Sequence, residues 1–207
     1  MIQRWEMGRR SDHSREEISR MALDAAMEIV KAEGLSGLTA RKVATRIGYA
    51  PGTLYVVFRN QDDLILNLNA RTLDQLYQFL EEAVQHCRKP QQCILKLANA
   101  YLAFAAEQAN LWSAVFEHHP ADGEEVPLWY QEKIEHLFLL VEAPLRQLDS
   151  GSSDSEVRLA ANALWSGIHG VCTLRQLGSL GRGGSKESAI VESLVTHYLV
   201  GYAKQIN

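Results

Sequence analysis

Histidine and cysteine side chains gather at two places in the sequence where they could support metal or thiol chemistry. One group is His118, His119 and His136, and the other is His86, Cys87 and Cys93. Neither has a recognised metal-ligand spacing. The three cysteines are an odd number without a Cys-x-x-Cys pair, which argues against a secreted disulfide framework and a zinc ribbon. We therefore expect a reducing, cytoplasmic setting and no metal, and a metal- or thiol-dependent enzyme or sensor is the weakest alternative.

Motifs of the common enzyme classes are missing from the sequence. It has no G-x-S-x-G, no H-E-x-x-H and no phosphate-binding loop. We expect a protein that is not an enzyme and needs no cofactor. No apolar run approaches the roughly 18 residues of a membrane span, and the first ten residues lack the apolar segment of a signal peptide, so no membrane partner is expected.

Two short helical segments, Thr39 to Ile47 and Pro51 to Phe58, have the spacing of a helix-turn-helix. Thr39 can cap the first, and Gly48 tolerates the left-handed backbone that ends it. Pro51 suits the first position of the second, because its missing N–H would have no partner there. Such a pair can place the N-terminal end of its second helix in the major groove of DNA, although any corner of two helices can look similar.

Helical patterns cover almost the whole chain and predict an all-α fold. Ser14 and Glu17 have capping-box spacing before an apolar stripe that Gly34 ends, and Asn60 can cap a long helix reaching about Cys87. Pro144 is expected to kink or shorten its helix. Further helices are expected at about 91–107, 110–117, 127–148, 155–178 and 187–204. The first 61 residues carry a net positive charge and the remainder a net negative charge, as expected for a small nucleic-acid-binding module joined to an acidic body.

From Ser14 to Leu64 the sequence resembles the DNA-binding domain of the TetR family of bacterial regulators. The resemblance rests on Gly34-Leu35, Thr39, Val43-Ala44, the run from Ile47 to Tyr55, Phe58 and Asp63-Leu64. Trp165-Ser166-Gly167-Ile168-His169-Gly170 also resembles the Trp-His-Gly element of one TetR subgroup. The resemblance implies an N-terminal arm and three-helix helix-turn-helix domain over residues 1–61. It also implies a helical ligand-binding and dimerisation domain over residues 62–207.

Family resemblance then implies roles in binding a double-stranded DNA operator. The residues concerned are Thr39, Arg41, Lys42, Ala50, Gly52, Thr53, Tyr55 and Arg59. Thr39 could equally be a plain helix cap and Tyr55 a core aromatic. Two positions depart from the family, which often has His or Tyr at Val57 and Lys at Gln61. An arm containing Arg4, Arg9, Arg10, His13 and Arg15 could compensate by contacting phosphates, or could be a disordered tail.

The second half of the chain is rich in aromatic and histidine side chains on apolar helices, which is typical of pockets for small organic molecules. The candidates for binding a small apolar or aromatic effector are Tyr101, Phe104, Trp112, Phe116, Trp129, Tyr130, His136, Trp165 and His169. Each of them taken singly could instead belong to the core.

The last helix is apolar over more than one stripe and is expected to need partners on two sides. The expected homodimer contacts are Ile168, Val171, Val191, Leu194, Val195, Tyr198 and Tyr202. The expected mechanism is a two-state dimer in which the effector changes the distance between the two helix-turn-helix domains. We expect a repressor that ligand binding releases, with an activator as the alternative. A helical protein-interaction module that has lost DNA binding is the rival function.

Overall fold

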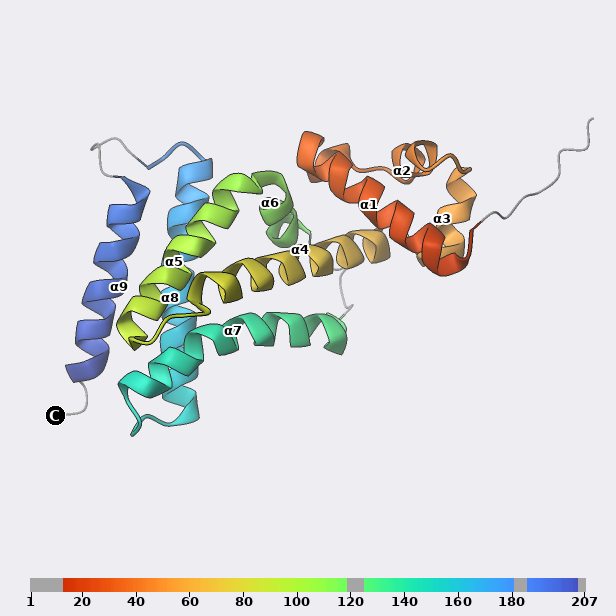
Figure 1. Ribbon diagram of the computed structural model, residues 1–207. Coiled ribbons are helices and arrows are strands. Elements are labelled where there is room, and N and C mark those ends of the chain that lie inside the picture. The colour runs from red at the N-terminus through yellow and green to blue at the C-terminus, as the bar shows by residue number, and fades with distance from the viewer. Residues whose placement is uncertain (1–12, 119–124, 181–185, 205–207) are drawn as a thin grey trace, which may run out of the picture. The chain divides into compact units, whose positions relative to one another are not determined.

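The computed structural model describes residues 13–118, 125–180 and 186–204, and it confirms the all-α architecture. Its elements are α1 (Arg15–Glu33), the 3₁₀ turn η1 (Leu35–Gly37), α2 (Ala40–Arg46), α3 (Pro51–Val57), α4 (Gln61–Val84), α5 (Pro90–Glu107), α6 (Ala109–Glu117), α7 (Leu128–Leu148), α8 (Asp154–Gln176) and α9 (Glu187–Lys204). Figure 1 labels the helices along the chain.

The chain divides into two compact units, Met1–Leu68 and Asn69–Asn207. Helix α4 begins in the first unit and ends in the second. The sequence analysis places the domain boundary between residues 61 and 62, at the start of α4. That boundary stays a prediction. Within the described ranges, every helix is too short or too polar to cross a membrane.

Local capping explains where the N-terminal helices begin. Ser14 and Glu17 form the predicted capping box of α1, in which the Ser14 hydroxyl accepts from the Glu17 N–H and the Glu17 carboxylate accepts from the Ser14 N–H. Asn60 Oδ1 accepts from the Asp63 N–H at 2.8 Å at the start of α4. The sequence-based placement of these caps is confirmed.

Two helix endings differ from the sequence-based expectation. Helix α4 ends at Val84 rather than near Cys87, and the chain leaves it in a turn in which the Cys87 N–H bonds back to the Val84 carbonyl. Helix α7 is not shortened by Pro144 and continues to Leu148. Pro144 and Leu145 are both buried, so core packing holds the last turn despite the missing N–H.

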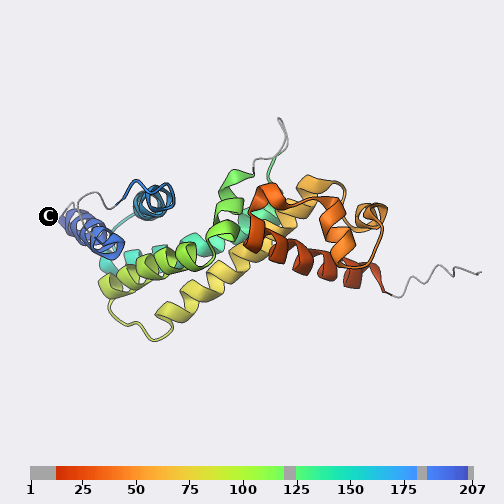
Figure 2. The same ribbon diagram turned by 90° about the horizontal axis from the view of Figure 1, so that it is seen from above.

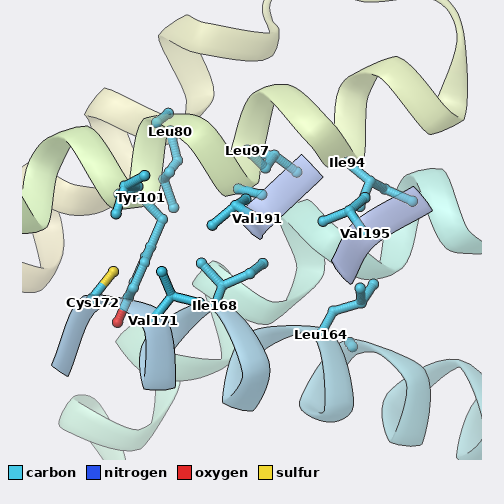
Figure 3. Packing of buried hydrophobic residues seen from close by; sticks show 14 of the residues in the cluster. Leu80, Ile94, Leu97, Tyr101, Leu164, Ile168, Val171, Cys172, Val191 and Val195 are labelled. Atoms are coloured by element: carbon cyan, nitrogen blue, oxygen red, sulfur yellow. The ribbon is translucent and has the colours of Figure 1, made fainter. Parts of the chain in front are cut away.

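The second unit has one main apolar core, formed where α5, α8 and α9 pack together with α4 and α7. Helices α8 and α9 lie side by side in both ribbon views (Figures 1 and 2). Figure 3 shows Leu97 and Tyr101 of α5 facing Ile168 and Val171 of α8, with Val191 and Val195 of α9 beside them. Helix α9 therefore has partners on two sides within one chain.

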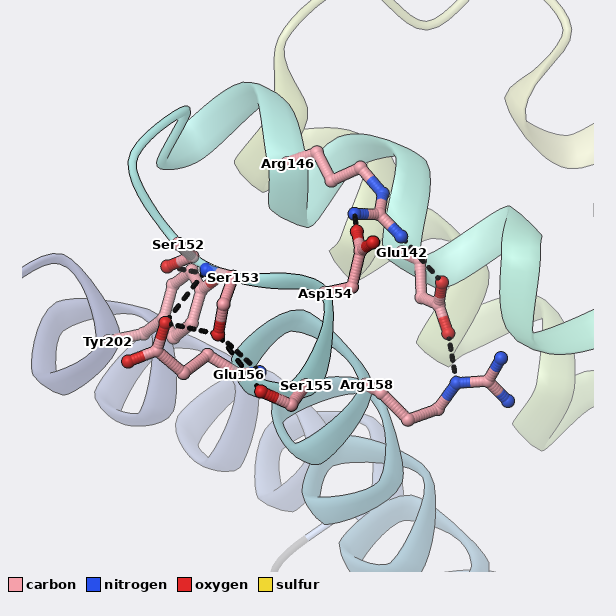
Figure 4. Close-up of polar contacts among 9 residues, drawn as sticks. All are labelled: Glu142, Arg146, Ser152, Ser153, Asp154, Ser155, Glu156, Arg158 and Tyr202. Carbon is pink, nitrogen blue, oxygen red and sulfur yellow. Dashed lines mark hydrogen bonds and ion pairs between the residues drawn. The ribbon is translucent and has the colours of Figure 1, made fainter.

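Ion pairs join α7 to α8 at the edge of this core. The Glu142 carboxylate is almost fully buried and pairs with Arg146 at 3.2 Å and with Arg158 at 2.7 Å. Figure 4 shows these pairs and a second capping box, made by Ser153 and Glu156 at the start of α8. This network fixes how α8 leaves the turn that follows α7.

Candidate nucleic-acid interface and effector site

The turn between α2 and α3 is closed by a glycine in left-handed geometry. Gly48 has φ 77°, its N–H bonds to the Thr45 carbonyl, and the Tyr49 N–H bonds to the Ala44 carbonyl at 2.9 Å. These two bonds form a Schellman motif, which satisfies carbonyls left open at the end of α2. Buried Val43 and Ala44 hold α2 against the rest of the unit. The predicted helix-turn-helix geometry is present.

Helix α3 is anchored on one side and exposed on the other. Leu54 and Phe58 are buried, whereas Tyr55 is 56% exposed and Val56 is 53% exposed. Tyr55 is therefore not a core aromatic. A Cβ added to Gly52 would meet nothing within 4 Å, so packing within the chain does not require this glycine. The N-terminal end of α3 is open to a close approach from outside.

Two of the cationic residues predicted to contact DNA have carboxylate partners within the chain. Lys42 pairs with Glu33 at 2.5 Å, and the Arg59 side chain lies 3.7 Å from Asp63. Arg41 is exposed on α2. The Thr39 hydroxyl accepts from the Lys42 N–H at 3.2 Å and so acts as the helix cap. Ala50 is the N-cap residue of α3, and Thr53 is half-buried within that helix.

The positions that depart from the family have roles inside the first unit. Gln61 donates from Nε2 to the Leu38 carbonyl at 3.2 Å, and Val57 is half-buried. Arg15, which the sequence placed in a phosphate-contacting arm, donates to the Val56 carbonyl in the last turn of α3. His13 Nδ1 and Tyr49 Oη are 2.7 Å apart. Arg4, Arg9 and Arg10 lie outside the described residues.

Five of the predicted effector residues form one aromatic group. The ring of His169 lies 4.3 Å from Phe116, 4.8 Å from Trp112 and 5.0 Å from Trp165, measured between ring centroids. Its Nδ1 is 3.0 Å from the Tyr101 hydroxyl. Burial lowers the pKa of His169 and raises that of Tyr101. We call Tyr101, Trp112, Phe116, Trp165 and His169 the aromatic cluster.

The other four predicted effector residues lie away from that cluster. Phe104 is buried and packs edge-on against Phe79, whereas Trp129 is 40% exposed. Tyr130 is buried, which raises its pKa to about 12. His136 is exposed, with its ring centroid 6.4 Å from that of Tyr77. The structure thus brings the nine candidates together only in part.

Asn69 is a polar residue near this region that sequence reasoning missed. It is 1% exposed on α4, and its Nδ2 donates to the Ala114 carbonyl of α6 at 3.1 Å. Its Oδ1 has no hydrogen-bond partner among the described residues. A buried acceptor without a partner costs free energy. No local pattern in the sequence marks it.

Most of the predicted dimer contacts are buried within a single chain. Ile168, Val171, Val191, Val195 and Tyr202 all belong to the core of the second unit. Leu194 is half-buried against Gly167, and Tyr198 is half-buried against the core. The five core residues cannot face a partner subunit without leaving this packing, and their place as contacts is corrected accordingly.

Exposed side chains form a different stripe on α8 and α9. Leu159 and Leu174 of α8 are 68% and 45% exposed, Leu177 at its C-cap is 70% exposed, and Val200 of α9 is 49% exposed. Small residues at helical intervals continue the stripe, namely Ala163, Ser166 and Gly170 on α8 and Ala189, Ser193 and Thr196 on α9. We call this set the α8–α9 stripe.

The helix-turn-helix and the helical second unit define a class, that of two-part bacterial regulators with an N-terminal DNA-reading module. Comparison with known families agrees. Residues 22–68 match the family described as bacterial regulatory proteins, tetR family, and residues 94–198 match the tetracyclin repressor-like C-terminal domain. The chain belongs to the TetR family, which comprises regulators rather than enzymes.

Individual relatives are more distant. The fatty acid metabolism regulator protein of Bacillus subtilis is 25% identical over 89 residues, which are 43% of this chain and 46% of that protein. The uncharacterized regulator YobS of the same organism is 30% identical over 95 residues, 46% of this chain and 49% of that one. The match therefore spans about half the length of each curated relative.

Solved structures share the fold over most of the chain. A protein with unknown function from Rhodococcus sp. RHA1 has a TM-score of 0.77 at 22% identity, covering 94% of this chain and 99% of that one. Bacillus subtilis FadR, solved in complex with stearoyl-CoA, has a TM-score of 0.63 at 20% identity, covering 88% of this chain and 98% of that one.

Proposed function

We propose that this chain is a cytoplasmic, ligand-responsive transcription regulator that binds a palindromic DNA operator through α3 and is released by a small apolar or aromatic effector. The observation that carries the proposal is the exposed face of α3. Tyr55 and Val56 are more than half exposed on a helix that Leu54 and Phe58 anchor. Large exposed side chains on a firmly held helix mark a surface that binds a partner. The open end at Gly52 suits the close approach of a groove.

Selection from random duplexes at low salt tests the DNA half of the proposal. We expect a palindromic site with half-sites ~34–36 Å apart and an affinity that falls steeply with salt. Tyr55→Ala should weaken binding at least tenfold without lowering thermal stability, because the side chain makes little contact with its own unit. Leu128→Ala is the control, since Leu128 is a still more exposed apolar residue, on α7. Recovery of no palindrome would favour the protein-interaction module.

The effector half of the proposal rests on the aromatic cluster. Phe116, Trp165 and His169 are only half-buried, so part of the cluster is open to a flat or apolar ligand. The imidazole of His169 would supply a polar contact that fixes the orientation of the ligand. A fatty acyl chain is also apolar, and the stearoyl-CoA of the FadR complex makes acyl-CoAs natural test compounds beside flat aromatics.

Tryptophan fluorescence reports effector binding directly, because Trp112 and Trp165 lie in the cluster. An effector should quench emission and raise the melting temperature. It should also weaken operator affinity by the same factor by which bound DNA weakens binding of the effector. Trp129→Phe should leave the quenching in place, whereas Trp165→Phe should reduce it. Quenching without a change in melting temperature would count against a bound effector.

Homodimer formation is proposed to occur through the α8–α9 stripe. The stripe combines exposed leucines with small residues that allow two helix pairs to approach closely. A stable dimer would bury ~1,200–2,000 Å². Leu174→Glu should give monomers at micromolar concentration in light scattering. Leu128→Glu, at a more exposed leucine on α7, should leave the dimer intact. A wild-type monomer would reject the proposal.

A further inference from the structure

Cys87 and Cys93 are joined in a disulfide that connects the segment after α4 to the first turn of α5. Their Cα atoms are 5.6 Å apart, within the range that a disulfide spans without backbone movement. Both residues are half-buried, so solvent reaches them. The loop geometry therefore holds the two thiols at bonding distance in the folded chain.

A cavity of about 370 Å³ lies beside this pair. Cys87 and Cys93 form part of its wall together with Tyr77, Leu97 and His136. A water molecule takes up roughly 30 Å³, so the cavity has ample room for a small oxidant or for the head of a reducing thiol. Both sulfur atoms thus border a space that small reactants can enter.

The surroundings of this pair differ from those of the third cysteine. Arg88 and Lys89 follow Cys87 in the sequence, and Cys93 lies near the N-terminal end of α5. Cys172 is 1% exposed on α8, and burial raises its pKa to about 11. Cys87 and Cys93 therefore border the cavity, whereas the free Cys172 is enclosed in the core.

We propose that Cys87 and Cys93 are a reversible oxidation site that responds to hydroperoxides. One thiolate attacks the peroxide, forming a sulfenic acid and releasing water or an alcohol. The second thiol then displaces water from that sulfur and forms the disulfide. Overall, two thiols and one hydroperoxide give one disulfide, one water and one alcohol, or two waters for hydrogen peroxide. Reduction by a dithiol reverses the step.

Oxidation at this site constrains how α4 meets α5. The disulfide closes the turn at Cys87 onto Cys93, whereas the reduced form leaves that turn held by backbone bonds such as that from the Cys93 N–H to the Lys89 carbonyl. The two oxidation states should therefore differ in local stability at the cavity wall. This inference does not depend on whether the chain binds DNA.

Thiol counting on the fully reduced chain tests the proposal. After treatment with hydrogen peroxide, two of the three thiols should be lost, and peptide mapping should find a link between Cys87 and Cys93. Cys172→Ser should leave this reaction unchanged and is the matched control. Cys87→Ser and Cys93→Ser should each abolish the link within one chain, with circular dichroism confirming that both variants fold.

Three results would overturn the proposal. They are loss of all three thiols at one rate, links only between chains, and a disulfide that millimolar reduced glutathione cannot open. The last result would make the bond a permanent structural crosslink. Hydrogen exchange of residues 84–93 that is faster in the reduced form than in the oxidised form would support the local constraint, and equal exchange would contradict it.

Discussion

A Cβ added to Gly167 of α8 would lie 2.6 Å from Cδ1 of Leu194 on α9. The absence of a side chain at Gly167 is therefore what allows Leu194 to pack there. Gly167→Ala should lower the free energy of unfolding by less than about 1 kcal/mol, because the clashing atom is the movable end of a half-buried leucine and alanine itself gains ~0.5–1 kcal/mol in a helix. Urea unfolding monitored by circular dichroism measures the change.

Gly201 and Leu194 provide the controls for this prediction. A Cβ on Gly201 of α9 meets nothing within 4 Å, and Gly201 lies outside the α8–α9 stripe, so Gly201→Ala should raise the free energy of unfolding. In a Leu194→Ala background the cost of Gly167→Ala should disappear, since the clashing methyl is gone. A cost that persists in that background would place the clash elsewhere.

Replacing the buried carboxylate of α7 should destabilise the second unit. Glu142→Gln removes the charge that Arg146 and Arg158 share, with an expected loss of about 2 kcal/mol after allowing for the partial exposure of both arginines. Glu135→Gln is the control, because Glu135 pairs with Arg158 at 2.6 Å but is exposed. That variant should lose less than ~1 kcal/mol. Equal losses would show that burial of Glu142 contributes nothing.

The aromatic cluster should make stability depend on pH. Burial lowers the pKa of His169 below its ordinary 6.5, so the unfolded chain binds the proton more tightly than the folded chain. The free energy of unfolding should then fall as pH drops from 7 through 6.5 toward the folded pKa. Melting temperatures of the wild type and His169→Gln across pH 5–8 test this point. The melting temperature of His169→Gln should change less with pH than that of the wild type. Parallel plots of melting temperature against pH would exclude His169 as the cause.

Gln61→Lys should strengthen operator binding while weakening the first unit. The substitution supplies the lysine common in the family and removes the bond to Leu38, which is worth about 0.5–1.5 kcal/mol. Affinity should rise and its salt dependence should steepen by about one phosphate contact. Gln61→Met, which removes the bond without adding charge, should lower stability equally and leave affinity unchanged. A tighter-binding Gln61→Met would refute the role of charge.

Local signals in the sequence predicted the helices well. The caps at Ser14, Thr39 and Asn60, the left-handed Gly48 and Pro51 each act within a few residues, so the sequence contains everything that determines them. The same register predicted a buried side formed by Leu54, Tyr55 and Phe58, which is correct for Leu54 and Phe58 and wrong for the exposed Tyr55. These features do not depend on how distant segments meet.

Features that depend on distant segments were not predictable in the same way. The apolar breadth of α9 correctly indicated partners on two sides, but both partners, α5 and α8, belong to the same chain. Val191 and Val195 are consequently core residues rather than contacts with a second copy. The bond from Asn69 forms only where α4 meets α6, and the cavity beside Cys87 only where α4, α5 and α7 come together.

Helix α4 has a practical consequence for building chimeric regulators. The boundary between the compact units falls between Leu68 and Asn69, inside this continuous helix. A fusion joint placed there would make side chains three and four residues apart on α4 come from two different proteins, so their mutual packing would be lost. A joint at Asn60, just before α4, would transplant a complete helix together with its cap. Exchange of DNA-reading modules between such regulators should therefore follow helix ends rather than the limits of the compact units.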